Sequence, residues 1–394
     1  MEASFSTSHS CVVADGQLPV WALDEGFESY GALYIHIPFC RKRCAYCDFT
    51  TEAACSDDPR LDAYVESLER DIRKASALGL LKDVKTIYFG GGTPSYLGLR
   101  RLARLLYCLN LSMRVEPDVE FTLEANPDSL TAPMVKDLFA LGVTRLSLGV
   151  QSFNDDELAM LGRIHSADDA LRAIDTALTR FEHVSIDLMC GFPNQSLTNF
   201  QASLERALSC GVDHLSIYPL TLEEGTPLDA SVEAGLLPCP NDDLACEMMQ
   251  LAAKKCQGAG FRRYEVASYA KPGGASRHNQ AYWTGIPYLG LGRGAVGMKQ
   301  NASCRIRYDQ DGVIERISHE QRVAEDLMLG MRRTVGISGD EVVKACFVLP
   351  DAWDTFDSLV DDGYASYEDG FFVPTEKGWL LGNRMYGRIL DLAP

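Results

Sequence analysis

Strand-forming and helix-forming stretches alternate along the first half of this chain, and this alternation limits the folds that it can adopt. The runs between the short β-branched and aromatic stretches carry apolar residues at helical spacing, as at Leu61, Tyr64 and Leu68. A helix between two strands makes the strands parallel and covers the sheet. The sequence therefore predicts an α/β fold whose parallel sheet forms a full or partial (β/α) barrel. The six expected strands are 33–37, 86–89, 120–123, 145–149, 184–188 and 214–218.

The remaining chain divides by composition into further regions. Residues 1–30 carry no sustained periodicity and are predicted to be an N-terminal lead-in to a barrel core at 31–260. Residues 261–318 are predicted to be a connecting region, because much of this stretch is rich in glycine and aromatic residues and poor in helical spacing. Helical spacing resumes in 319–394, which we expect to form a small, mainly helical, winged-helix-like domain.

The balance of charges narrows the expected partners. The chain has 37 Lys+Arg against 55 Asp+Glu, a formal net charge of −18. Nucleic acid is not expected as the main partner, because affinity for its backbone comes from clustered cations. No run approaches the ~20 apolar residues that span a bilayer, so no integral membrane segment is expected. The N-terminal residues lack the pattern of a secretory signal, and we expect a cytoplasmic protein with reduced cysteines.

Three of the 13 cysteines are crowded directly after the first expected strand. Cys40, Cys44 and Cys47 form the pattern C-x3-C-x2-C, and thiolates at such spacing in a loop can converge on one metal centre. A cubane iron-sulfur cluster held by three thiolates keeps one iron open to another ligand. The alternatives are a structural zinc site with His36 as the fourth ligand, or a chance cluster of unliganded thiols.

This cysteine pattern, followed by a GGG turn after the second expected strand, resembles the radical S-adenosylmethionine superfamily. In that superfamily three cysteines bind a [4Fe–4S] cluster, and S-adenosylmethionine chelates the open iron. Further motifs occur in the order found in the oxygen-independent coproporphyrinogen oxidase group, and together they extend the resemblance over nearly the whole chain. They are YIHIPFC, YFGGGTPSYL, EANPDSL, LGVQSFND, LGRIH and IDLMCGFP.

The positions of these motifs agree with barrel chemistry, because active sites of such folds gather at the carboxyl ends of the strands. The carboxylate of Glu124, the amide of Gln151 and the guanidinium of Arg163 can together hold a zwitterionic amino acid and a ribose. The resemblance implies that Cys40, Cys44 and Cys47 bind the cluster. It also implies a set of residues that contact S-adenosylmethionine: Tyr34, Tyr46, Gly91, Gly92, Thr93, Glu124, Gln151, Arg163 and Asp187.

Two features distinguish haem carriers from oxidases within this group. The oxidases are similar to C-x3-C-x2-C-x-C, but the position of the additional cysteine holds Phe49 here. The segment 277–283, RHNQAYW, resembles the H-N-x-x-Y-W motif of the HemW haem chaperones. In this motif His278 offers an imidazole to haem iron, while Tyr282 and Trp283 offer apolar area to a porphyrin face.

The leading hypothesis is therefore a HemW-type haem chaperone with a radical S-adenosylmethionine core in a partial barrel, rather than a coproporphyrinogen dehydrogenase. Its expected cofactors are a [4Fe–4S] cluster, S-adenosylmethionine and haem, and its expected partners are haem-dependent apoproteins. The first alternative is an oxygen-independent coproporphyrinogen III oxidase, which removes two propionate carboxyls in porphyrin biosynthesis. The second is a zinc-stabilised barrel that acts on a small molecule.

Overall fold

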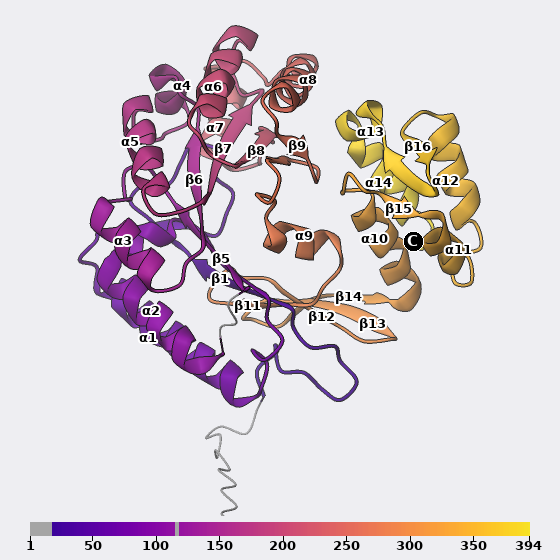
Figure 1. Ribbon diagram of the computed structural model, residues 1–394, viewed down its shortest axis with the longest axis horizontal. Coiled ribbons are helices and arrows are strands. Elements are labelled where there is room, and N and C mark those ends of the chain that lie inside the picture. The colour runs from indigo at the N-terminus through magenta and orange to yellow at the C-terminus, as the bar shows by residue number, and fades with distance from the viewer. Residues whose placement is uncertain (1–17, 115–117) are drawn as a thin grey trace, which may run out of the picture.

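One curved sheet dominates the computed structural model, which describes residues 18–114 and 118–394 (Figure 1). Twelve strands in these ranges are ordered β14-β13-β12-β11-β1-β4-β5-β6-β7-β8-β10-β9. The six strands expected from the sequence are present, adjacent and parallel, which confirms the predicted α/β class. They are β1 (Ala32–Ile37), β4 (Thr86–Gly91), β5 (Glu120–Ala125), β6 (Arg145–Gln151), β7 (His183–Cys190) and β8 (His214–Pro219).

The connections between these strands are helical and cover the outer side of the sheet (Figure 1). Several begin with a side-chain cap that satisfies free backbone N–H groups, such as the capping box of Ser166 and Asp169. The covering helices are α1 (Pro59–Ala77), η1 (Pro94–Leu97), α2 (Leu99–Ser112), α3 (Ala132–Ala140), α4 (Asp155–Met160), α5 (Ala167–Leu178) and α6 (Leu197–Ser209). After β8 follow α7 (Pro227–Glu233) and α8 (Asp242–Gly258).

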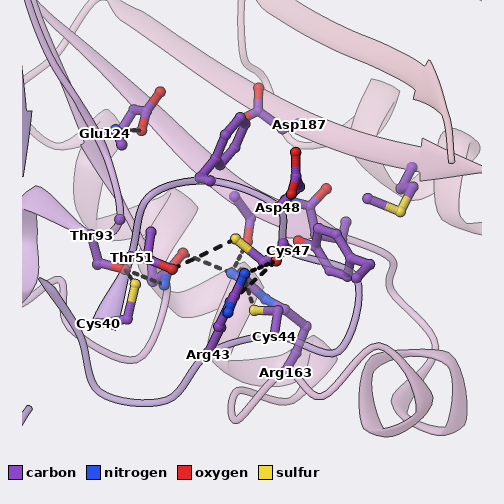
Figure 2. Close-up of a pocket in the computed structure, with 18 of the residues that line it drawn as sticks. Cys40, Arg43, Cys44, Cys47, Asp48, Thr51, Thr93, Glu124, Arg163 and Asp187 are labelled. Atoms are coloured by element: carbon purple, nitrogen blue, oxygen red, sulfur yellow. Dashed lines mark hydrogen bonds between the residues drawn. The ribbon is translucent and has the colours of Figure 1, made fainter. Parts of the chain in front are cut away.

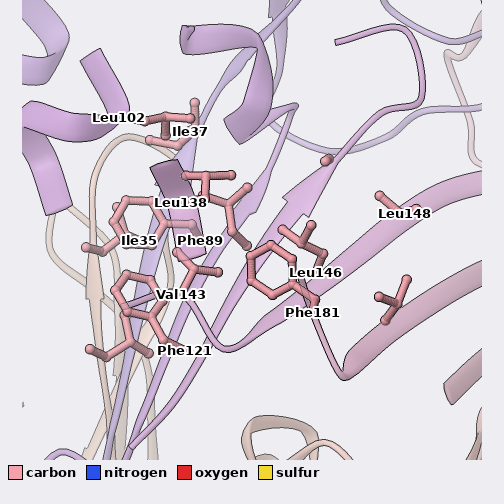
Figure 3. Close-up of a cluster of buried hydrophobic side chains, with 14 of the residues drawn as sticks. Ile35, Ile37, Phe89, Leu102, Phe121, Leu138, Val143, Leu146, Leu148 and Phe181 are labelled. Atoms are coloured by element: carbon pink, nitrogen blue, oxygen red, sulfur yellow. The ribbon is translucent and has the colours of Figure 1, made fainter. Parts of the chain in front are cut away.

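The parallel strands separate two kinds of side chain, because successive residues of a strand point to opposite faces. Aliphatic and aromatic residues such as Ile35, Phe89 and Leu146 face the helices and form the main core (Figure 3). Phe89 stacks on Phe121 at a centroid distance of 5.4 Å. The residues between them point to the inner face, so the alternation brings the polar side chains of several strands together inside the curved sheet.

The segment 261–318, predicted as a connecting region, supplies six strands to the same sheet. β11 pairs parallel with β1, and the strands after it form an antiparallel edge. No pairing joins the edge strands β14 and β9 in the described ranges, so the sheet is an open, partial barrel. The strands are β9 (Arg262–Arg263), β10 (Ser268–Ala270), β11 (Tyr288–Leu291), β12 (Gly297–Gln300), β13 (Cys304–Tyr308) and β14 (Val313–Ser318).

A short helix within this segment corrects the expectation that its centre is non-helical. The RHNQAYW stretch forms α9 (Arg277–Trp283), with Ser276 as its N-cap, and lies on the inner side of the sheet (Figure 1). Seven residues give too few turns for an apolar period to be visible in the sequence. Contacts with strands distant in the sequence stabilise this helix, as described below.

The C-terminal residues form a separate core beside the sheet. The order helix, strand, two helices and two strands, with β15 paired to β17 and β17 to β16, is the arrangement of a winged helix with two added helices. This agrees with the predicted mainly helical, winged-helix-like character. The elements are α10 (His319–Gly330), β15 (Ile337–Ser338), α11 (Gly339–Ala345), α12 (Ala352–Asp361), β16 (Ala365–Glu368), β17 (Phe371–Pro374), α13 (Glu376–Leu380) and α14 (Gly382–Leu390).

Part of the predicted N-terminal lead-in packs against the sheet. Trp21 and Tyr30 are buried in the main core, and the Tyr30 hydroxyl donates to the Trp21 carbonyl at 2.8 Å. Residues 1–17 of the lead-in lie outside the described residues. Among the described helices, none combines the length and the apolar character needed to cross a membrane.

Candidate functional site

The cysteine loop is anchored at both ends. Two short parallel strands, β2 (Phe39–Cys40) and β3 (Glu52–Ala53), close its base. The Glu52 N–H donates to the Pro38 carbonyl at 2.7 Å, and the Ala54 N–H donates to the Cys40 carbonyl at 3.1 Å. A loop held in this way presents its thiols in a fixed position at the carboxyl end of β1.

The structure brings most of the predicted site residues to one cavity of about 450 Å³ (Figure 2). It lies at the carboxyl ends of the parallel strands, where a barrel collects residues from several loops. Its lining includes the three cysteines of the loop and also Tyr46, Gly91, Gly92, Thr93, Glu124, Gln151, Arg163 and Asp187.

Two consecutive glycines let the chain pass close to the cysteine loop. Gly91 has a φ of +108°, and a Cβ built on it would lie 2.4 Å from the His36 ring. A Cβ on Gly92 would lie 2.8 Å from the Ile37 carbonyl oxygen and 3.1 Å from the Cys40 sulfur. A side chain at Gly91 would collide with His36, and one at Gly92 with the backbone and the thiol of the cysteine loop, which explains why this turn requires glycine.

Two carboxyl groups that line the cavity are partly buried and hold protons more tightly than usual. Burial raises the pKa of Glu124 to about 7 and the pKa of Asp187 to about 6. Glu124 accepts hydrogen bonds from the Tyr88 hydroxyl at 2.7 Å and from the Gly91 N–H at 3.2 Å. Carboxyl groups placed in this way can accept hydrogen bonds from an ammonium or ribose hydroxyl group.

Arg163 connects the cysteine loop to the neighbouring strand ends. Its guanidinium lies 3.4 Å from the Cys44 sulfur, donates to Asn126 Oδ1 at 2.7 Å and also donates to the Gly149 carbonyl. The residue before it, Gly162, has a φ of +76°, and a Cβ there would lie 2.9 Å from the Ala45 nitrogen. The LGRIH motif therefore packs against the cysteine loop through Gly162 and supplies a positive charge beside Cys44 through Arg163.

Gln151 has a backbone conformation that L-residues rarely adopt. Its φ is +70°, and the Tyr218 hydroxyl donates to its side-chain oxygen at 2.9 Å. Residues held in the left-handed region cluster at functional sites, where the surrounding structure overcomes the strain. Here the strain occurs at the carboxyl end of β6 and directs an amide into the cavity.

The chemistry of the cavity fits an iron-sulfur cluster with one open position. Cys40, Cys44 and Cys47 are the cysteines that border it, and no histidine of the described residues lines it. Burial raises the pKa of Cys40 to about 11, against the opposing effect of a hydrogen bond from Thr93, so metal binding must favour its thiolate form. No group of three or more His, Cys, Asp or Glu side chains in the described ranges is placed to hold a single metal ion.

His36, the fourth ligand of the zinc alternative, lies outside this cavity. Its Nδ1 is 3.0 Å from the Tyr34 hydroxyl and its Nε2 is 2.9 Å from the Thr50 carbonyl oxygen, so both ring nitrogens have partners. Tyr34, predicted to contact S-adenosylmethionine, lines a neighbouring groove together with His36. The structure therefore separates these two residues from the cysteines.

His278 of the predicted haem motif lies near the amino ends of β4 and β5, while Tyr282 of the same motif lines the neighbouring groove. His278 is 1% exposed, and its ring stacks on Tyr88 at a centroid distance of 4.9 Å. Its Nδ1 is 2.9 Å from the Thr86 hydroxyl and its Nε2 is 3.0 Å from the Tyr282 hydroxyl. Burial lowers the pKa of His278 to about 3, so this imidazole is neutral.

Trp283 faces the C-terminal domain. Its Nε1 donates to Glu265 at 3.0 Å, and the Arg332 guanidinium lies 4.9 Å from its ring centroid and 4.7 Å from that of Tyr386. Arg332 thus joins α9 to α14 by two cation–π contacts. Trp283 lines neither the cysteine cavity nor the neighbouring groove.

Several lining residues were absent from the sequence prediction. Asn126 donates to the Thr93 hydroxyl at 2.9 Å and accepts from Arg163, so it joins two predicted residues. Asn126 follows Glu124 by two residues in the EANPDSL motif, at the end of a strand, and this position could have predicted its place in the cavity. Ser216 and Tyr218 come from the inner face of β8, and the alternation of that strand was the corresponding signal.

The fold and this site define a radical S-adenosylmethionine protein. Residues 34–207 match the Radical SAM superfamily. The solved structure of coproporphyrinogen III oxidase (HemN) from Escherichia coli superposes with a TM-score of 0.78, covering 92% of this chain and 90% of that chain. At 21% identity this likeness shows the shared fold alone.

Curated relatives identify the family more closely. The chain is 33% identical over 374 residues to the heme chaperone HemW of Bacillus subtilis (strain 168), covering 91% of this chain and 98% of the relative. It is 38% identical over 267 residues to the heme chaperone HemW of Escherichia coli (strain K12), covering 68% of this chain and 69% of the relative. The chain belongs to the HemW family, as the sequence motifs predicted.

Proposed function

We propose that this chain is a cytoplasmic haem chaperone, which carries a [4Fe–4S] cluster and S-adenosylmethionine, binds haem and delivers it to apoproteins. The proposal rests mainly on the anchored loop, which places three thiols on one cavity. This loop has Phe49 at the position where the oxidases have an additional cysteine. The twelve cysteines in the described ranges are all free, as a reducing compartment requires.

The first part of the proposal concerns the cluster. Cys40, Cys44 and Cys47 would hold it, and when bound it would supply electron-transfer chemistry to S-adenosylmethionine. The chain's own residues orient that ligand: Glu124 and Asp187 accept hydrogen bonds from it, and Arg163 presents positive charge beside Cys44. Tyr46 closes one wall of the cavity, packed in a small apolar cluster with Leu161.

The second part concerns haem, which the motif of His278, Tyr282 and Trp283 on α9 contacts, with the imidazole of His278 offered to the iron. A neutral imidazole suits this role, and burial keeps His278 neutral. Its Nε2 is bonded to the Tyr282 hydroxyl, so ligation requires Tyr282 to turn away. The curated relatives named heme chaperones support haem as the cargo.

The test is a haem titration of anaerobically reconstituted protein, followed by its Soret absorption. We expect saturable binding of one haem per chain, and at least tenfold weaker binding by His278→Ala with the cluster absorption intact. The matched control is His183→Ala, because His183 is half-exposed and bonded to Asp213 at the start of β7. Absence of stoichiometric haem binding by the parent contradicts the proposal.

One observation favours coproporphyrinogen oxidation as a second candidate. The cavity assembles a set of polar residues for a small charged ligand, and a radical reaction on a bound substrate would use the same set. Decarboxylation of coproporphyrinogen III under reducing, oxygen-free conditions supports that candidate. Retention of haem binding without product formation supports the chaperone.

A further inference from the structure

A second concave surface lies on the other side of the cysteine loop. It is an open groove of about 360 Å³, and Asp48 and Phe49 line both this groove and the cysteine cavity. The segment 48–49 therefore forms a thin wall between the two. The volume falls within the range of small-molecule sites.

The walls of this groove are mainly aromatic. Tyr34 comes from β1, Tyr282 from α9 and Tyr288 from β11, and Val296 follows β11. The rings of Tyr282 and Tyr288 meet edge to face at a centroid distance of 4.8 Å. Three separate elements thus place ring surface around one groove.

Its rim exposes apolar side chains. Phe49 is 68% exposed and Val296 is 38% exposed. Large apolar side chains grouped beside a concave surface mark ligand sites more often than isolated ones do. An aromatic groove with an apolar rim suits the face of a flat, apolar ring system.

Two arginines lie close to the groove. Arg293 directly precedes the lining residue Gly294. Arg307 lies on β13, one strand beyond Met298, which is the β12 partner of the lining residue Tyr288. Both also pair with carboxylates: Arg293 with Glu52 at 2.9 Å, and Arg307 with residues of β14 and α10. Guanidinium groups at the side of a flat site can bind the carboxylates of a ligand that lies in it.

We propose that this groove binds the face of a planar tetrapyrrole dicarboxylate, the cargo of the proposed haem chaperone, between Phe49 and Val296 on the rim and Tyr282 and Tyr288 on the wall. The inference rests on the proposed function and adds the place of binding. The open side of the groove leaves one edge of the ring accessible, as transfer to an acceptor requires. Tyr282 joins the groove to the histidine of α9, because its hydroxyl bonds His278 Nε2.

The experiment compares two groove variants with a matched control in the reconstituted full-length protein. Phe49→Ala removes the exposed ring, and Val296→Glu puts a carboxylate on the rim far from the cysteines in the sequence. Phe347→Ala is the control, because Phe347 is 88% exposed in the C-terminal domain. Each protein is titrated with haem and with iron-free protoporphyrin IX, and cluster absorption is recorded to verify the fold.

We expect about tenfold weaker binding of both ligands by each groove variant, and less than a twofold change in the control. Unchanged affinity in both groove variants, with a parent that binds haem, overturns the groove while leaving the proposed function intact. Weaker haem binding with unchanged protoporphyrin binding also overturns it, because the effect then acts through the iron. A parent that binds neither ligand rejects the proposed function itself.

Discussion

The two ends of the parallel strands are built in opposite ways. At the carboxyl ends, glycines, thiols and partly buried carboxyl groups surround a cavity of about 450 Å³. At the amino ends, α9 is held by Glu120, whose carboxylate accepts hydrogen bonds from the N–H groups of Arg277 and His278 and from the Ser276 hydroxyl. One end leaves polar groups open to a ligand, and the other uses a buried carboxylate to hold a helix in place.

The cysteine motif and the motif on α9 therefore differ in how many distant parts of the chain they need. The cysteine motif needs only a short loop to gather its thiols. The motif on α9 connects distant parts of the chain: His278 stacks on Tyr88, which bonds Glu124, and Trp283 contacts the C-terminal domain through Arg332. The following predictions test whether the cavity at the carboxyl ends and the buried contacts of α9 respond differently to substitution.

The largest effect is expected at the open end. Cys44→Ala removes one of three thiolates, and two cannot hold a cubane stably, so we expect complete loss of cluster absorption with the fold retained. The matched control is Cys55→Ala, since Cys55 is an exposed free cysteine outside the cavity. Iron and sulfide analysis measures the outcome, and a normal cluster content in Cys44→Ala contradicts the ligand assignment.

The next effect is expected at the buried contacts of α9. Glu120 is 8% exposed and lies 3.5 Å from the guanidinium of Arg145, which is 2% exposed. Glu120→Gln leaves that charge buried without its counter-ion, so the free energy of unfolding should fall by about 3 to 5 kcal/mol. Urea unfolding of the apoprotein measures this. The exposed control Glu233→Gln should stay within about 0.5 kcal/mol of the parent, and an equally small effect of Glu120→Gln would remove the distinction between the ends.

The carboxyl group of Glu124, which lines the cavity, should make the stability of the protein depend on pH. Burial raises the pKa of Glu124 from 4.5 to about 7, so its stabilising contribution is full below about pH 4.5 and is lost as the pH rises through 7. Glu124→Gln cannot ionise, and its amide can keep the bonds to Tyr88 and Gly91.

The stability of Glu124→Gln relative to the parent should therefore increase between pH 5 and pH 8, by at most about 2 to 3 kcal/mol. Thermal unfolding of both apoproteins across this range measures the difference. A difference that does not depend on pH contradicts the raised pKa.

The smallest effect is expected at the contact with the C-terminal domain. Trp283→Phe keeps an aromatic face for Arg332 but removes the hydrogen bond to Glu265, so we expect a loss of about 1 to 2 kcal/mol in stability. Haem affinity should change less than twofold, because Trp283 does not line the groove. A large loss of haem affinity with unchanged stability would assign Trp283 to the haem site.

Much of the architecture was predictable because it rests on local patterns. Short stretches of β-branched and aromatic residues between helical segments indicate strands, and the six expected from the sequence are confirmed. The spacing of the cysteines and the positions of Glu124 and Gln151 at strand ends similarly predicted residues that share one cavity.

The remainder depends on contacts between distant residues. α9 is too short for a visible period, and its N-terminus is fixed by Glu120, more than 150 residues earlier. The pairing of β11 with β1 also joins opposite ends of the barrel region, which no local pattern indicates. The hydrogen bonds of both ring nitrogens of His278, to Thr86 and to Tyr282, likewise depend on the fold and could not be predicted from the sequence.

The central claim is that three cysteines hold a cluster with one iron open to an exchangeable ligand. Electron paramagnetic resonance of the reduced, anaerobically reconstituted protein, recorded before and after addition of S-adenosylmethionine, tests it most directly. The account predicts a [4Fe–4S]⁺ signal whose shape changes when S-adenosylmethionine is added. A protein that takes up no iron and sulfide, or a cluster signal that S-adenosylmethionine leaves unchanged at saturating concentration, contradicts it.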